Sequence, residues 1–237
     1  MGFAVLLRQT ALFLLPIFLL WLLWELRGKM RLWHVLIPIL LVVLFIVPWT
    51  VRNYKVFDQF LLLNSNSGYA LYASNNPNLG KKWDSEKVVV PIPDELTGFN
   101  EAELDRALLK QAIQFVIEDP VRYLILTFSK APEFFKFWPS SQSSTASNIS
   151  RVISFGLFLP FMVWGLASSI ANWKKYLILY LFALSHTALY LLSWPAPRYR
   201  LPVDAVMIIF AGFALNNLVN RIYFRKKHMK VSKSFNP

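Results

Sequence analysis

Five apolar runs, each long enough to cross a bilayer as a helix, restrict what this chain can fold into. They are residues 3–24, 32–49, 152–171, 176–194 and 202–219. A hydrocarbon core of about 30 Å needs about 20 apolar residues in helical form. Because lipid offers no hydrogen-bond partners, backbone N–H and C=O groups must be paired within each run. We therefore predict a mainly α membrane protein with about five transmembrane helices.

Composition agrees with this class. Of 237 residues, 56% are hydrophobic, above the 45–50% that is usual for soluble domains. There is no cysteine, and the three histidines are scattered without ligand spacing, so we predict no disulfide, no metal site and no cofactor. The first apolar run is followed by Glu25 and Arg27 and not by a small-residue cleavage site. We interpret it as a retained membrane helix and not as a cleaved signal peptide.

The charges are distributed unevenly, which predicts an orientation. Residues 51–150 hold 11 of the 13 acidic residues and 10 of the 25 Lys and Arg residues, so this block is net −1 while the chain is +12. Basic residues cluster in the loops 27–31 and 174–175 and in the tail 221–237. The positive-inside rule makes that side, with the C-terminus, cytoplasmic. We assign the tail to membrane anchoring and not to nucleic acid.

This charge pattern predicts four regions. Two transmembrane helices occupy residues 1–50, an extracytoplasmic block 51–150, three transmembrane helices 151–220 and a basic cytoplasmic tail 221–237. In the block, residues 57–80 alternate short apolar runs with Asn, Ser, Gly and Pro, which indicates strands joined by turns. A small mixed α/β block is therefore expected.

Two helices are predicted in the second half of the block. Residues 100–119 read as an amphipathic helix in which Asn100 and Glu103 have the spacing of a capping box. Pro120 suits the first position of a second helix, over residues 120–138. This second helix is aromatic, so it could lie along the membrane interface.

Four arginines lie on the predicted outer side, where the positive-inside rule does not predict basic residues. They are Arg8, Arg52, Arg198 and Arg200. One explanation is that each long side chain snorkels from a helix end to the membrane surface. The other is that their planar guanidinium groups bind phosphate oxygens. A phosphate at this depth would belong to the head group of a lipid phosphate or pyrophosphate.

The segment that carries Arg198 and Arg200 lies between prolines. Proline fixes φ and biases the residue before it toward extended geometry. Since side chains alternate in an extended segment, we predict Arg198 and Arg200 on one side, facing one anion, and Tyr199 on the other. In the alternative, the segment is a tight turn with snorkelling arginines, and Asp204 pairs with Arg200 at i, i+4.

Four stretches, taken together, resemble a known family. They are "GFAVLLRQTALFLLP", "PWTVRNYKVFDQFLLLNSNSGYALYASNNPNLG", "EDPVRYLILTFSKAPEFFKFW" and "PRYRLPVDAVMIIFAGFAL". In this order they resemble the C-terminal half of GT-C membrane glycosyltransferases, and most of all glycosyltransferase family 39, with its protein mannosyltransferases and bacterial aminoarabinose transferase. The first stretch keeps the family's basic residue as Arg8 but lacks its Thr and Pro.

The resemblance implies transfer of a sugar from a polyprenyl-phosphate donor at the outer face of a multi-pass membrane protein, in the bacterial inner membrane. The family's catalytic carboxylates lie in an N-terminal half that this chain does not contain, so no catalytic residue is assigned. Arg8, Arg52, Arg198 and Arg200 become candidates for binding the donor phosphate. Two hypotheses stay open. The chain is part of such an enzyme, or it is a non-catalytic scaffold subunit that packs against another membrane protein.

Overall fold

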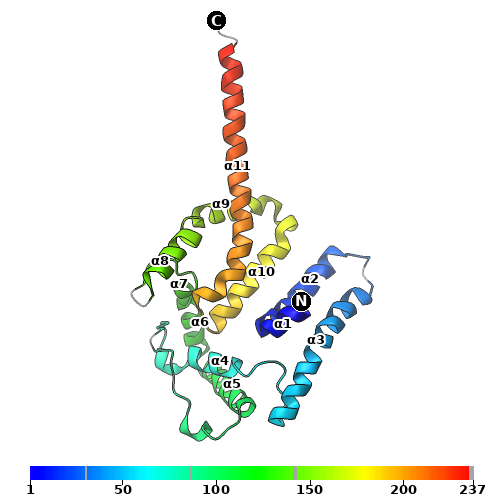
Figure 1. Cartoon of the computed structure of the whole chain (residues 1–237), viewed down its shortest axis with the longest axis vertical. Coiled ribbons are helices and arrows are strands. Elements are labelled where there is room, and N and C mark those ends of the chain that lie inside the picture. Colours follow the sequence, from blue (N-terminus) through cyan, green and yellow to red (C-terminus); the bar gives the residue numbers. More distant parts are fainter. Residues whose placement is uncertain (30, 86, 141–142, 235–237) are drawn as a thin grey trace. The chain divides into compact units, whose positions relative to one another are not determined.

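The computed structural model describes residues 1–29, 31–85, 87–140 and 143–234, and every regular element in that part is helical (Figure 1). The α-helices are α1 (Gly2–Leu7), α2 (Leu14–Glu25), α3 (Trp33–Phe57), α4 (Ser67–Asn75), α5 (Glu101–Glu118), α6 (Pro120–Ser129), α7 (Ala131–Phe134), α8 (Thr145–Arg151), α9 (Leu159–Ser169), α10 (Trp173–Leu192) and α11 (Leu201–Ser234). Short 3-10 turns are η1 (Gln9–Phe13), η2 (Pro77–Leu79), η3 (Asp94–Leu96), η5 (Ile170–Asn172) and η6 (Pro197–Arg200), and η4 (Val152–Gly156) is a π-helical turn. Of the predicted tail, residues 235–237 lie outside the described part.

The chain forms two compact units. Unit 1 comprises Met1–Phe134 and Leu184–Ala196, and unit 2 comprises Phe135–Ala183 and Pro197–Pro237. The boundary between them falls within α10, so the last turns of that helix belong to unit 1.

Within the described residues, three helical stretches are long and apolar enough to cross a membrane: Trp33–Phe57, Thr145–Leu192 and Pro197–Arg221. The second of these contains α8, α9 and α10. The predicted membrane character is therefore confirmed, whereas the predicted number of about five spanning helices is corrected to three candidate spans.

The first predicted span, residues 3–24, is not one helix. Its backbone is extended at Arg8, with φ −144° and ψ 112°, and the apolar helix that follows covers only Gln9–Glu25. The polar residues at the break have partners elsewhere in unit 1. Arg8 donates to the hydroxyl of Tyr190, and the side-chain oxygen of Gln9 accepts from the backbone N–H of Asn64. These long-range contacts, which local hydrophobicity does not reveal, accompany the break.

The second predicted span continues past its expected end. Helix α3 runs through Pro48 to Phe57, where Asp58 takes a left-handed conformation (φ 52°) and donates its N–H to the carbonyl of Tyr54. A proline removes one backbone hydrogen bond, whereas ending the helix in an apolar environment would leave several groups unpaired. The extra turns position Asn53, whose amide donates to the carbonyls of Leu61 and Leu63.

The block 51–150 contains no strand among its described residues, so the prediction of a mixed α/β block is wrong. In place of strands, α4 lies against α5 (Figure 1). Its Tyr72 and Ala73 belong to a core with Leu108 and Ala112 of α5. Short apolar runs bounded by turn residues do not distinguish strand from buried helix, and here packing on α5 accompanies the helical form.

The two helices predicted after α4 are confirmed. Asn100 accepts from the backbone N–H groups of Ala102 and Glu103, and Glu103 accepts in return from the N–H of Asn100, which completes the capping box of α5. Pro120 occupies the first turn of α6. The second helix is shorter than predicted, because α6 ends at Ser129 and α7 follows as a separate element.

Unit 2 is centred on the packing of α9 against α11. A Cβ atom at Gly165 would lie 1.8 Å from the carbonyl oxygen of Phe210, so the two backbones approach where only glycine fits. Phe210 also stacks on Tyr180 of α10, with ring centroids 5.4 Å apart.

Gly165→Ala should destabilise unit 2 by about 1–3 kcal/mol, because the added methyl group forces the helices apart. Thermal unfolding of the purified protein in detergent should show a lower Tm. Gly212→Ala is the matched control, since a Cβ atom there meets nothing within 4 Å. Equal Tm values for both variants would contradict this account of the α9–α11 contact.

Candidate functional site

The four predicted arginines are divided between the units. Arg8 and Arg52 belong to unit 1, and Arg198 and Arg200 belong to unit 2. Each pair is therefore considered within its own unit.

The segment with Arg198 and Arg200 is the 3-10 turn η6 and not an extended strand, so the predicted alternation of side chains is wrong. With three residues per turn, residues two apart point in different directions. Arg198 is exposed, whereas Arg200 is only 3% exposed. The prolines therefore stiffen a helical turn that separates the two guanidinium groups.

Arg200 has partners inside unit 2. Its Nε donates to Oδ1 of Asp204 at 2.8 Å, so the predicted i, i+4 pair is confirmed. Its Nη1 donates to the carbonyl of Lys136, and its Cζ lies 3.5 Å from the ring centroid of Phe155. These contacts satisfy a charge that would be costly to bury alone.

Arg198 is the more accessible of the two. Its Nη2 donates to the hydroxyl of Tyr199 at 3.1 Å, and its Cζ lies 5.0 Å from the centroid of that ring. It lies in η6, the 3-10 turn that leads directly into α11. Because Asp204 in the first turn of α11 is paired with Arg200, the positive charge of Arg198 is not offset by that carboxylate.

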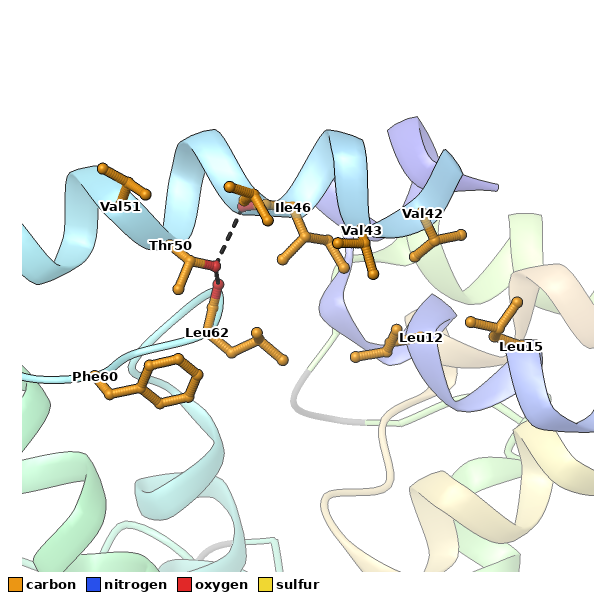
Figure 2. Close-up of a pocket in the computed structure, with 10 residues that line it drawn as sticks. Leu12, Leu15, Val42, Val43, Ile46, Thr50, Val51, Phe60 and Leu62 are labelled. Carbon is orange, nitrogen blue, oxygen red and sulfur yellow. Dashed lines mark hydrogen bonds between the residues drawn. The ribbon is translucent and has the colours of Figure 1, made fainter. Parts of the chain in front are cut away.

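Unit 1 contains an apolar pocket of about 420 Å³ (Figure 2). It is lined by six residues of α3 between Val42 and Val51, by Leu12 and Leu15 across from them, and by Phe60 and Leu62. Figure 2 shows the side chains of α3 facing those of η1 and α2. The pocket falls in the size range of small-ligand sites, and its apolar wall suits a hydrocarbon chain.

The lining has one polar side chain, Thr50, and its hydroxyl is turned to the backbone. Its Oγ1 approaches the carbonyls of Ile46 and Leu62, at 3.2 and 2.8 Å (Figure 2). The pocket therefore recognises apolar shape, and any charged group must be bound beside it.

Arg52 follows the last lining residue of α3, Val51. It is exposed, its Nη1 donates to Oδ1 of Asn53 at 3.1 Å, and its Cζ lies 5.2 Å from the ring centroid of Trp49. Arg8, which donates to the hydroxyl of Tyr190, comes shortly before the lining residue Leu12 in the chain. Unit 1 thus has an apolar pocket, and two arginines are close in sequence to residues that line it: Arg52 next to Val51, and Arg8 before Leu12.

A second basic cluster escaped the sequence reasoning. Lys130 is 0% exposed and Arg122 is 8% exposed, both in unit 1. Lys130 Nζ donates to Oδ1 of Asn75 at 3.0 Å and to the carbonyl of Ser193 at 2.9 Å. Arg122 donates to the carbonyls of Asn75 and Asn76. Within the described part of the chain, neither side chain forms an ion pair with a carboxylate.

In place of a carboxylate, oxygen atoms at the C-terminal ends of helices accept hydrogen bonds from these two cations. Asn75 is the last residue of α4 and Ser193 follows α10, so carbonyls from the C-termini of two helices lie at the two cations. Unpaired carbonyls give each C-terminus a partial negative charge of roughly half a unit. Burial and the neighbouring Arg122 nevertheless lower the pKa of Lys130 from 10.5 to about 7. No local sequence pattern marks this cluster, because Asn75 lies 47 residues from Arg122 and Ser193 lies 63 residues from Lys130 in the chain.

The other end of α4 carries an anion. The Asp105 carboxylate accepts from the N–H of Gly68 and from the hydroxyl of Ser67, at the first turn of that helix. Burial raises the pKa of Asp105, although both hydrogen bonds favour the ionised form. Helix α4 therefore has a negative side chain at its positive end and two cations at its negative end, which matches its dipole.

The fold and these sites define an all-helical protein, over the described residues, with three candidate membrane spans. The described residues contain no group of three or more His, Cys, Asp or Glu side chains suited to a metal ion. Comparison with protein-family models, curated proteins and solved structures gives no match.

Proposed function

We propose that the chain is a C-terminal portion of a polyprenyl-phosphate-sugar-dependent membrane glycosyltransferase, and that it binds the lipid phosphate at the outer face of the membrane. The observation that carries the proposal is the apolar pocket of unit 1 with Arg52 beside its lining. An amphiphile needs both parts, a wall for its hydrocarbon chain and a cation for its phosphate. The sugar-transfer part of the proposal rests on the family resemblance of the four sequence stretches.

The four arginines contribute differently in this proposal. Arg52 in unit 1 and Arg198 in unit 2 are both exposed, and each is available to a phosphate at its own unit. Arg8, close in sequence to the lining residue Leu12, is the second candidate cation of unit 1. Arg200, held by Asp204, supports the turn that presents Arg198. During transfer, the exposed guanidinium groups would stabilise the negative charge that develops on the leaving phosphate.

Arg52→Gln should weaken binding of a polyprenyl phosphate by about tenfold or more, because charge-assisted hydrogen bonds contribute about 1.5–3 kcal/mol. Binding of the matching polyprenol, which lacks the phosphate, should not change. Native mass spectrometry of the detergent-solubilised protein measures both. Lys110→Gln, on an exposed side chain of α5, is the control and should bind both lipids normally. An equal loss for both lipids, or no loss for either, would count against the phosphate role of Arg52.

A second candidate function is a non-catalytic scaffold subunit in a larger membrane complex. It is favoured by the roles of Asp105 and Asp204, which are engaged in capping α4 and in holding Arg200. Both carboxylates therefore have a structural role. Stoichiometric copurification with a membrane complex, together with absence of polyprenyl phosphate binding, would favour this candidate over the first.

A further inference from the structure

Helix α6 has its charged side chains inside and its apolar side chains outside. Arg122, Leu126 and Thr127 are buried, as is Lys130 at its C-cap. The opposite side, at positions i, i+3, i+4 and i+7, is apolar and exposed. It consists of Val121, Leu124, Ile125 and Phe128, with Phe128 74% exposed. An amphipathic helix in a water-soluble domain shows the reverse arrangement.

The same surface continues onto α5. Ile113 and Ile117, one turn apart near its C-terminus, are also exposed, and Ile117 is 73% exposed. We call these two residues and the four of α6 the α5–α6 apolar face. All six lie outside the candidate membrane spans. Exposed apolar side chains gathered on one side of a helix, as on α6, mark contact with a membrane or a partner.

Two hydrogen bonds connect α6 to the end of a candidate membrane span. The hydroxyl of Tyr123 donates to the carbonyl of Leu192, the last residue of the span Thr145–Leu192. Lys130 Nζ donates to the carbonyl of Ser193, the next residue. Both bonds lie within unit 1, so α6 is held where the chain leaves the bilayer. Trp194 follows directly, and tryptophan is enriched at the membrane–water boundary.

From this placement we propose that the α5–α6 apolar face is immersed in the lipid surface, as an interfacial helix of the membrane that the chain spans. The occupant is the boundary between head groups and acyl chains. Burial of Arg122 and Lys130 in unit 1, with the apolar side chains turned outward, is the arrangement that lipid favours and water opposes. The inference does not depend on the proposed function, since it requires neither a lipid phosphate nor Arg52.

Spin labels attached to single cysteines test this placement, and the chain offers a background without native cysteine. Val121→Cys, Leu124→Cys, Ile125→Cys and Phe128→Cys are each labelled and reconstituted in nanodiscs of phosphatidylcholine and phosphatidylglycerol. Glu95→Cys, on the exposed turn η3, is the control. Collision with oxygen, which enters lipid, is compared with collision with a water-soluble nickel complex. Unchanged Tm values establish that each labelled variant is folded.

All four labels on α6 should be accessible to oxygen and protected from nickel, at about 5–10 Å below the phosphate level. The label at position 95 should show the opposite preference. Nickel access at the α6 positions would overturn the proposal by placing the face in water. Protection from both reagents would overturn it as well, since it would show a protein surface covering α6.

Discussion

Asp204→Leu is expected to destabilise unit 2 by about 3–5 kcal/mol, because it leaves the buried guanidinium of Arg200 without its counter-ion. The remaining contacts of Arg200 with the carbonyl of Lys136 and the ring of Phe155 carry no full negative charge. Denaturant-dependent unfolding in mixed micelles, followed by tryptophan fluorescence, measures the loss. The expected loss is larger than for Asn75→Leu or Gly165→Ala, because Asp204→Leu removes a full counter-charge.

The double variant Arg200→Met with Asp204→Leu should recover most of that loss, since replacing both members of a buried pair by apolar residues is often close to neutral. Arg198→Met is the control on the neighbouring exposed arginine and should change stability little. If Asp204→Leu alone unfolds like the unsubstituted protein, the ion pair has no structural role.

Below about pH 7, where Lys130 is protonated, Asn75→Leu is expected to destabilise unit 1 by about 3 kcal/mol, because it removes an acceptor from the buried ammonium of Lys130. Leucine is close to asparagine in volume, so the change in packing is small. The backbone carbonyl of Asn75 still accepts from Arg122, whereas the bonds from its Nδ2 to the carbonyl of Leu71 and to Oγ of Ser74 are lost together with the bond from Lys130. The double variant Asn75→Leu with Lys130→Met should be much more stable than Asn75→Leu alone.

The contribution of Lys130 to stability should increase with pH. In the folded chain the pKa of Lys130 is about 7, below its ordinary 10.5, so the unfolded chain binds more protons between these values. The contribution of Lys130 to stability therefore rises with pH from about 7 to about 10.5, by at most about 1.4 kcal/mol per pH unit. Lys130→Met should remove this rise. A rise that persists in Lys130→Met would assign it to another group.

Local features of the sequence were enough to locate several elements. The Asn100–Glu103 capping box and Pro120 lie where α5 and α6 begin, since both act within one helical turn. The pair of Arg200 with Asp204 is local in the same sense. In residues 57–80 the Asn, Ser and Gly residues suggest turns between strands, and that prediction is wrong. The helix α4 forms there instead, and its partners on α5 lie more than 30 residues away in the chain.

The candidate sites depend on still longer connections. Alternation along residues 198–200 suggested a shared direction for two arginines, and the 3-10 turn separates them into an exposed and a buried one. Lys130 and Arg122 look like ordinary charges of an amphipathic helix. Their role depends on carbonyls at the ends of α4 and α10, which no window of sequence places beside them.

The sequence by itself determined the membrane character and the starts of α5 and α6, because hydrophobic runs and caps act over one segment of chain. Only the tertiary structure decided which side of each helix is inside. In α6 that decision turns Arg122 and Lys130 inward and four apolar side chains outward. The physical reason is that a buried cation is stable only where other parts of the chain bring acceptors to it, and those acceptors come from helix ends far away in sequence.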